Sequence, residues 1–374
     1  MWVDGYDALD DLLVRICAAL QITSTQHQLA EDRYGTIGKW LEAPGSPLAP
    51  FGPVIYPQGS LRIGTTVKPI GHQEYDLDLV CEFRKLDWRR LRNPVVLLEA
   101  VETRLRAHQT YRAMLERKKR CLRVCYTNDF HLDILPACPD PDSGRECIVV
   151  PDRALRDWMP SNPNGYATWF EARAASVLTE VSKRVEPLPA QEPLELKAPL
   201  KRVVQLLKRW RDLAYRANPD LAPVSIVLTT LAASYYRGED SPARALSGIL
   251  DATVESLPPE GYRLEVRNPT NEKEDFGERW DAQPGAYQAF VTGITAFRTG
   301  WRALLGVRGL HLVTAGLSQL FGEDVAKSAV RGHTEAIEKA RSSRQLGVQR
   351  GTGAMISGAS PGAVPVKRNT FHGV

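Results

Sequence analysis

The sequence EYDLDLV, residues 74–80, places two aspartates inside an otherwise apolar run. Side chains two residues apart lie on the same face of a β-strand, so Asp76 and Asp78 should point one way while Leu77 and Leu79 point into a core. Two carboxylates fixed side by side repel each other and favour a divalent cation that prefers oxygen ligands, such as Mg²⁺ or Mn²⁺. An isolated Asp-x-Asp is more often the solvated end of a strand, but this apolar setting favours a metal site.

A third aspartate, Asp133, lies in a later apolar segment. We expect residues 122–135 to form a second strand, closed by Pro136, with His131 and Asp133 on one face. If this strand pairs with the first, the three carboxylates can hold two cations about 3.5–4 Å apart, one activating an attacking hydroxyl and the other binding phosphates. The pattern therefore predicts phosphoryl or nucleotidyl transfer at a carboxylate triad.

A Gly-Ser pair precedes the first two aspartates. Gly59 and Ser60 follow a turn indicated by Pro57, and we expect residues 61–65 to open a short helix with Ser60 near its N-cap. A helix start with a glycine leaves backbone amides free to bind phosphate, and Ser60 adds a hydroxyl donor. Such a pair is more often a simple turn. The interpretation of Gly59-Ser60 as a phosphate-binding turn therefore depends on the aspartates that follow.

Five stretches together resemble a known family, the DNA polymerase β-like nucleotidyltransferases, and within it the bacterial cGAS/DncV-like enzymes. They are residues 58–65, 75–78, 162–171, 200–212 and 268–280. The bacterial enzymes are second-messenger synthases of CBASS anti-phage systems, and the likeness runs from about residue 10 to about residue 330. The resemblance implies an α+β, bilobal fold, in which a mixed sheet with helices forms the catalytic core and a helical C-terminal lobe closes the cleft.

The resemblance also implies roles for individual residues. Asp76 and Asp78 would bind two Mg²⁺ or Mn²⁺ ions, and Asp133 would bind the catalytic ion and help to deprotonate the acceptor hydroxyl. These three aspartates are the expected catalytic and metal-binding residues.

The donor triphosphate would be held by Gly59 and Ser60 and clasped by Lys208 and Ser225. Without the resemblance, Lys208 is equally a surface lysine on an amphipathic helix. Ser225 is at least equally the N-cap of the apolar helix that follows it.

The implied function is template-independent synthesis of a cyclic di- or trinucleotide from NTPs, ATP or GTP or both, with release of pyrophosphate. An RNA-tailing or protein-nucleotidylating transferase on the same fold is the alternative, and RNA-stimulated incorporation of many nucleotides would indicate it. A non-catalytic basic nucleic-acid-binding protein is a remote third interpretation, which predicts activity that does not depend on the aspartates.

Helical apolar spacing predicts helices over residues 7–20, 24–41, 93–109, 200–213 and 225–236. The first two should brace the catalytic lobe. We expect this lobe to span residues 1–190, the helical lobe residues 191–340 and a flexible tail residues 341–374, with the lobe boundary in the Glu/Pro-rich stretch 186–193. The family resemblance suggests that a CBASS accessory protein binds the tail, although the terminal Val374 departs from tails that are conjugated.

Composition fits a cytoplasmic protein of 374 residues with a net charge of +4. The N-terminus lacks a signal-peptide pattern, no apolar run reaches 18 residues, and no membrane partner is expected. Six cysteines read as reduced thiols, because a zinc site would need a more regular spacing. Residues 104–123 carry eight Lys or Arg against one Glu, a basic stretch that is more often solvated than bound to nucleic acid or steering NTPs. Nucleic acid is thus an optional partner that the mechanism does not require.

Overall fold

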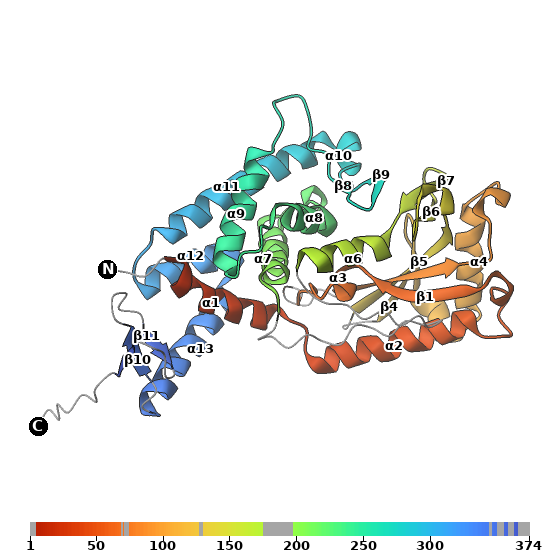
Figure 1. The fold of residues 1–374 in the computed structure, drawn as a ribbon. Helices are drawn as coiled ribbons and strands as arrows, with labels where there is room; N and C mark the ends of the chain where they lie inside the picture. The colour runs from red at the N-terminus through yellow and green to blue at the C-terminus, as the bar shows by residue number, and fades with distance from the viewer. Residues whose placement is uncertain are drawn as a thin grey trace, which may run out of the picture.

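The computed structural model describes residues 5–68, 70, 75–126, 130–174, 197–343, 346–349, 355–357 and 363–365. Figure 1 shows a lobe built on a β-sheet at one side of the molecule and a lobe of helices at the other. The expected α+β, bilobal architecture is therefore confirmed. The predicted lobe boundary near residue 190 lies outside the described residues and stays a prediction.

Seven strands of the described chain form one mixed sheet (Figure 1). At its centre, β2 (Tyr75–Phe83) and β5 (Phe130–Pro139) pair in parallel, whereas the other pairs are antiparallel. The remaining strands are β1 (Pro53–Gln58), β3 (Leu115–Arg117), β4 (Leu122–Tyr126), β6 (Ile148–Asp152) and β7 (Asp157–Ser161).

Residues 122–135 are not one strand, as the sequence had suggested. They form β4 and the first part of β5, which pair antiparallel with Tyr126 opposite Phe130. The prediction was wrong because apolar and polar residues alternate both in β4 and in β5, so the pattern does not show that the chain changes direction between the two strands. Pro136 does not end β5 either: it lies between the parts of β5 that pair with β4 and with β6, so its missing amide removes no antiparallel ladder bond.

Helices α2 (Ser24–Glu42) and α4 (Val95–Arg106) cover one face of the sheet. Leu77 and Leu79 of β2 point to this face and pack in one buried cluster with Ile37 of α2 and Val101 of α4. Because side chains alternate along a strand, the two aspartates of β2 face the other way. The apolar face thus fixes the direction in which the polar residues project.

The helical lobe and its connections supply the other side of the molecule. Its elements are α6 (Pro163–Arg173), α7 (Pro199–Ala214), α8 (Ser225–Tyr235), α9 (Pro242–Glu255), β8 (Arg267–Asn268), β9 (Asn271–Asp275), α10 (Arg279–Ala282), α11 (Pro284–Leu305), α12 (Leu310–Phe321) and α13 (Glu323–Ser342). In Figure 1, α6, α7 and α8 lie between the sheet and the outer helices. The predicted helices over 200–213 and 225–236 correspond to α7 and α8.

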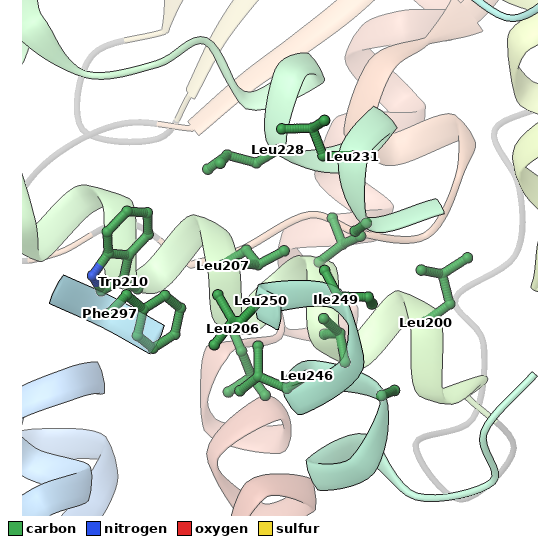
Figure 2. Close-up of a cluster of buried hydrophobic side chains, with 14 of the residues drawn as sticks. Leu200, Leu206, Leu207, Trp210, Leu228, Leu231, Leu246, Ile249, Leu250 and Phe297 are labelled. Carbon is green, nitrogen blue, oxygen red and sulfur yellow. The ribbon is translucent and has the colours of Figure 1, made fainter. Parts of the chain in front are cut away.

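Aromatic side chains fill the core of this lobe. Trp210 of α7 stacks on Phe297 of α11 with ring centroids 4.7 Å apart, and Figure 2 shows the pair beside the leucines of α7 and α9. Trp280 is also buried and stacks on Phe290 at 5.0 Å. Both tryptophans are therefore core residues.

The N-terminal helix α1 (Gly5–Leu20) packs with the helical lobe. Its buried side chains, among them Leu13 and Ile16, belong to the same cluster as Leu246 of α9 and Ala329 of α13. The expectation that both N-terminal helices brace the catalytic lobe is thus wrong for α1, because its apolar stripe is covered by helices from the other end of the chain. Thr23 caps α2 in a reciprocal capping box, which supports the predicted helix start.

Three short strands follow α13: β10 (Leu346–Gln349), β11 (Met355–Ser357) and β12 (Ala363–Pro365). β10 pairs with both others in antiparallel fashion. The last nine residues, with the terminus that we expect to be recognised, lie outside the described chain. In the ranges that the structure covers, no helix combines the length and apolar character needed to cross a bilayer.

Candidate active site

The parallel pairing of β2 with β5 brings the three predicted aspartates together. Asp76 lies opposite His131, and Asp78 lies opposite Asp133. Because the two strands are in parallel register, side chains at paired positions project from the same face of the sheet. Three carboxylates thus occupy neighbouring positions on two central strands, on the face that α2 and α4 leave uncovered.

Gly59 begins the short helix α3 (Gly59–Arg62) directly after β1. Its φ is +64°, and a Cβ at this position would lie 2.4 Å from Oδ2 of Asp78. Only glycine fits this combination of backbone conformation and close contact. Ser60 follows in the first turn of α3, with its hydroxyl 3.4 Å from that of Thr66, and Gln58 takes the N-cap position.

Lys208 projects from α7 and is buried, so it is not a solvated surface lysine. Its ammonium donates to the carbonyl and the hydroxyl of Thr65, at 3.1 and 3.3 Å. Burial and the nearby Arg211 lower the pKa of Lys208 to about 7, although Asp78 opposes the shift. A polyanion bound beside this ammonium would favour its charged form.

Ser225 is the first residue of α8, and its hydroxyl accepts a hydrogen bond from Nη1 of Arg211. The alternative interpretation of Ser225 as an N-cap is wrong: Val224 takes that position without a side-chain cap bond. Arg211 also donates from Nε to the neighbouring Asp212 at 2.8 Å. The guanidinium therefore links the first turn of α8 to the last turn of α7.

A cleft of about 520 Å³ separates the sheet from α7 and α8. Six of the seven predicted site residues line it: Gly59, Ser60, Asp76, Asp78, Lys208 and Ser225. Asp133 lies beside them, opposite Asp78 in the ladder. Residues more than 100 positions apart in the chain thus meet at one cleft between the two lobes.

Burial and mutual repulsion act on the carboxylates of this cleft. Burial, together with Asp133 and Asp76, raises the pKa of Asp78 to about 7, and burial also raises the pKa of Asp76. Among the described residues, the Asp78 carboxylate has no hydrogen bond or ion pair. This set of oxygen donors, one of them unpaired, fits a hard divalent cation.

Arg123 is a site residue that the sequence did not reveal. Its Nε and Nη2 each donate to one oxygen of Asp133 at 2.7 Å, and Nη2 also lies 3.0 Å from Oδ1 of Asp76. Arg123 belongs to the basic stretch 104–123, for which the sequence favours solvated side chains. The alternation along β4 was a usable signal, because it puts Arg123 on the opposite face from the buried Leu122.

The remaining arginines of the basic stretch are largely held in ion pairs. Arg106 and Arg117 bind the buried Glu102, and Arg120 joins Asp152 at 2.9 Å to Glu278 at 2.5 Å. Arg120 also lines the cleft, where it connects the sheet lobe to the segment before α10. The basic stretch therefore serves mainly for structural contacts and does not form one free basic patch.

All six cysteines are free thiols, as the sequence predicted.

Asp76 and Asp78 of β2 and Asp133 of β5 form an aspartate ladder across the paired strands. A Gly-Ser turn beside this ladder, facing a helical lobe across a cleft, defines a polymerase β-like nucleotidyltransferase. Comparisons with known proteins narrow this class. Residues 9–173 match the family model described as the Second Messenger Oligonucleotide or Dinucleotide Synthetase domain.

Two curated relatives extend over nearly the whole chain. The chain is 33% identical to a c-di-GMP synthase of Roseivirga ehrenbergii over 371 residues, covering 98% of this chain and 97% of the relative. It is 27% identical over 391 residues to the cyclic dinucleotide synthase CdnG of Bradyrhizobium diazoefficiens, covering 94% of this chain and 90% of that protein. The solved structure of the Bradyrhizobium diazoefficiens CdnG in complex with GTP superposes with a TM-score of 0.71 and 26% identity, over 88% of this chain and 100% of that one.

The chain belongs to the cGAS/DncV-like nucleotidyltransferases and is a synthase of cyclic oligonucleotides. Its substrates are nucleoside triphosphates, and enzymes of this family use divalent metal ions. The family assignment sets aside the RNA-tailing, protein-nucleotidylating and non-catalytic alternatives.

Proposed function

We propose that this enzyme joins two molecules of GTP into cyclic di-GMP, with release of two pyrophosphates. The choice of guanine is supported by the full-length relative that is a c-di-GMP synthase and by the GTP complex of the structural relative. The observation that carries the proposal is the aspartate ladder, which lies opposite Lys208 and Ser225 across one cleft.

In this proposal Asp76, Asp78 and Asp133 are the metal-binding and catalytic residues. Two Mg²⁺ or Mn²⁺ ions, held by the three carboxylates, would lower the pKa of the attacking hydroxyl and neutralise charge on the phosphates. Asp133 accepts the proton of the acceptor hydroxyl. The rigid pairing of β2 with β5 keeps the carboxylates in place, so little reorganisation is needed during the reaction.

The donor triphosphate is held from both sides of the cleft. Gly59 leaves room for the phosphates next to Asp78, and Ser60 donates its hydroxyl from the same turn. Lys208 and Ser225 bind the outer phosphates from the helical lobe, and the partly desolvated Lys208 gains charge when they arrive. The linear intermediate then turns over in the cleft and closes by a second attack of the same kind.

The aspartates are tested by incubating the protein with all four NTPs and Mg²⁺ or Mn²⁺, followed by phosphatase and mass spectrometry. We expect a phosphatase-resistant cyclic product, absent from an Asp76→Ala/Asp78→Ala double variant. Asp240→Ala is a matched control, because its side chain is 93% exposed and does not line the cleft. Product formation by the double variant would contradict the assignment.

We also propose that the product acts in defence against phage and that an accessory protein binds the C-terminal tail. Both proposals rest on the family resemblance. For the tail this is the sole support, because the last nine residues lie outside the described chain. Cells that express this enzyme together with its CBASS partners should resist phage, and both the double variant and removal of the last residues should abolish protection. Only the double variant should lose product formation by the isolated protein; unchanged protection after truncation would contradict a role for the tail.

A further inference from the structure

Arg123 is bound to two of the three aspartates at once. It lies on β4 directly opposite Asp133 of β5, so the ladder itself aims the guanidinium at this carboxylate. The contact with Asp133 is bidentate, with two bonds of 2.7 Å, whereas the contact with Asp76 is a single one of 3.0 Å. The Arg123 side chain is 19% exposed, which places this cation inside the site.

The contacts of Arg123 with Asp133 and with Asp76 differ in strength and in how easily another cation can displace them. Bidentate pairs of arginine with carboxylate are the strongest and most directional of these contacts. Each carboxylate has about four lone-pair sites, so Asp133 can keep its arginine and still offer an oxygen to another partner. The single bond to Asp76, whose side chain is 52% exposed, is the one that a competing cation can displace.

The arrangement of the carboxylates is consistent with such competition. In the described part of the chain, no three His, Cys, Asp or Glu side chains converge closely enough to hold an ion as they stand. A guanidinium and a divalent cation are like charges, and they cannot both occupy the space next to Asp76 without repelling each other. An ion that binds Oδ1 of Asp76 therefore displaces Arg123 from that oxygen.

We propose that Arg123 is a positioning residue with two opposing effects: it holds Asp133 in its working orientation and competes with the metal ion for Asp76. This inference rests on the proposed function of the aspartates as metal ligands. It predicts that metal affinity and turnover change in opposite directions when the guanidinium is removed, which a merely structural role would not produce.

The test compares Arg123→Met, which removes the charge, with Arg123→Lys, which keeps the charge but cannot make the bidentate contact. Binding of Mn²⁺ without nucleotide is measured by isothermal titration calorimetry, and kcat is measured with GTP at saturating Mn²⁺. Arg123→Met should bind Mn²⁺ about fivefold more tightly or better, because a like charge has gone. Its kcat should fall about tenfold or more, because Asp133 loses the group that orients it.

Arg123→Lys should keep the metal affinity to within about twofold while its kcat still falls, since an ammonium cannot make the bidentate contact. Lys118→Met is the matched control: it removes one positive charge from the same hairpin, where Lys118 pairs with the exposed Glu116 at 2.8 Å. The control should change neither quantity, and thermal melting identifies any variant that does not fold.

The outcomes separate this inference from the proposed function. If the wild-type protein binds Mn²⁺ and forms product, but Arg123→Met has unchanged or weaker metal affinity or an unchanged kcat, the role of Arg123 is wrong and the aspartate site stands. If neither the wild-type protein nor Arg123→Met binds Mn²⁺, and the wild type forms no product with it, the aspartates are not the metal site and both proposals are wrong.

Discussion

Gly59 and Asp78 lie so close together that the site tolerates no side chain at position 59: a Cβ there would be 2.4 Å from Oδ2 of the carboxylate. We therefore predict that Gly59→Ala displaces either the turn or Asp78 and lowers cyclic product formation about a hundredfold, the typical cost of a shift of about 1 Å in an active site. Rates of pyrophosphate release measure the effect.

Gly45→Ala is the control for this change, because no atom lies within 4 Å of the added Cβ. It should retain nearly full activity. Comparable activity of Gly59→Ala and Gly45→Ala would show that the close approach to Asp78 does not matter for catalysis.

Asp78 should make the metal-free protein less stable as the pH rises. The pKa of Asp78 is about 7 in the folded protein against an ordinary 3.8, so the folded state binds more protons between these values and loses stability as pH increases through them. Asp78→Asn removes the ionisable group and with it this loss of stability at high pH. In EDTA, the Tm of Asp78→Asn should exceed that of the wild type by about 2 °C or more at pH 8, and by clearly less at pH 4.5.

Addition of Mn²⁺ at pH 8 should raise the Tm of the wild type more than that of Asp78→Asn, because the ion binds the native carboxylate. A difference in Tm between the two proteins that is the same at both pH values would contradict the raised pKa of Asp78.

Lys208→Met should weaken the binding of a nonhydrolysable GTP analogue about 10- to 100-fold, the value of one or two hydrogen bonds to a charged group. The lysine is buried next to the cleft, whereas Lys327 is 63% exposed on α13 and serves as the matched control. Titration calorimetry gives both affinities. Equal affinities of Lys208→Met and Lys327→Met would exclude Lys208 from the triphosphate site.

The stacked pair in the helical lobe predicts a large effect on stability. Phe297 is fully buried against Trp210, so Phe297→Ala should lower the free energy of unfolding by about 3–5 kcal/mol. Leu312→Ala, at a side chain that is 49% exposed, should change it by less than about 0.5 kcal/mol. Urea unfolding followed by circular dichroism measures both, and a small effect of Phe297→Ala would show that the lobe is not packed as described.

The sequence predicted those parts of the fold that depend on local periodicity. Alternation around Asp76 and Asp78 predicted a strand with one polar face, and α7 and α8 follow from apolar spacing. The placement of α1 against the helical lobe could not be predicted in this way, because its apolar stripe fits any apolar partner and the partners are far away in the chain.

The same limit applies to the site. Asp133 could be assigned from its motif, but the role of Arg123 depends on the register between β4 and β5, which no local pattern specifies. Arg211 was likewise missed, since its contact with Ser225 joins two helices separated by a loop. Residues that act through pairing of distant elements require the structure.

The most direct measurement is incubation of the purified enzyme with GTP as the sole nucleotide and Mg²⁺ or Mn²⁺, followed by phosphatase treatment and mass spectrometry. We predict a phosphatase-resistant product with the mass and fragmentation of cyclic di-GMP, formed without ATP. A product that appears only when a second nucleotide is added would contradict the proposed substrate, and a linear product from GTP would contradict cyclisation.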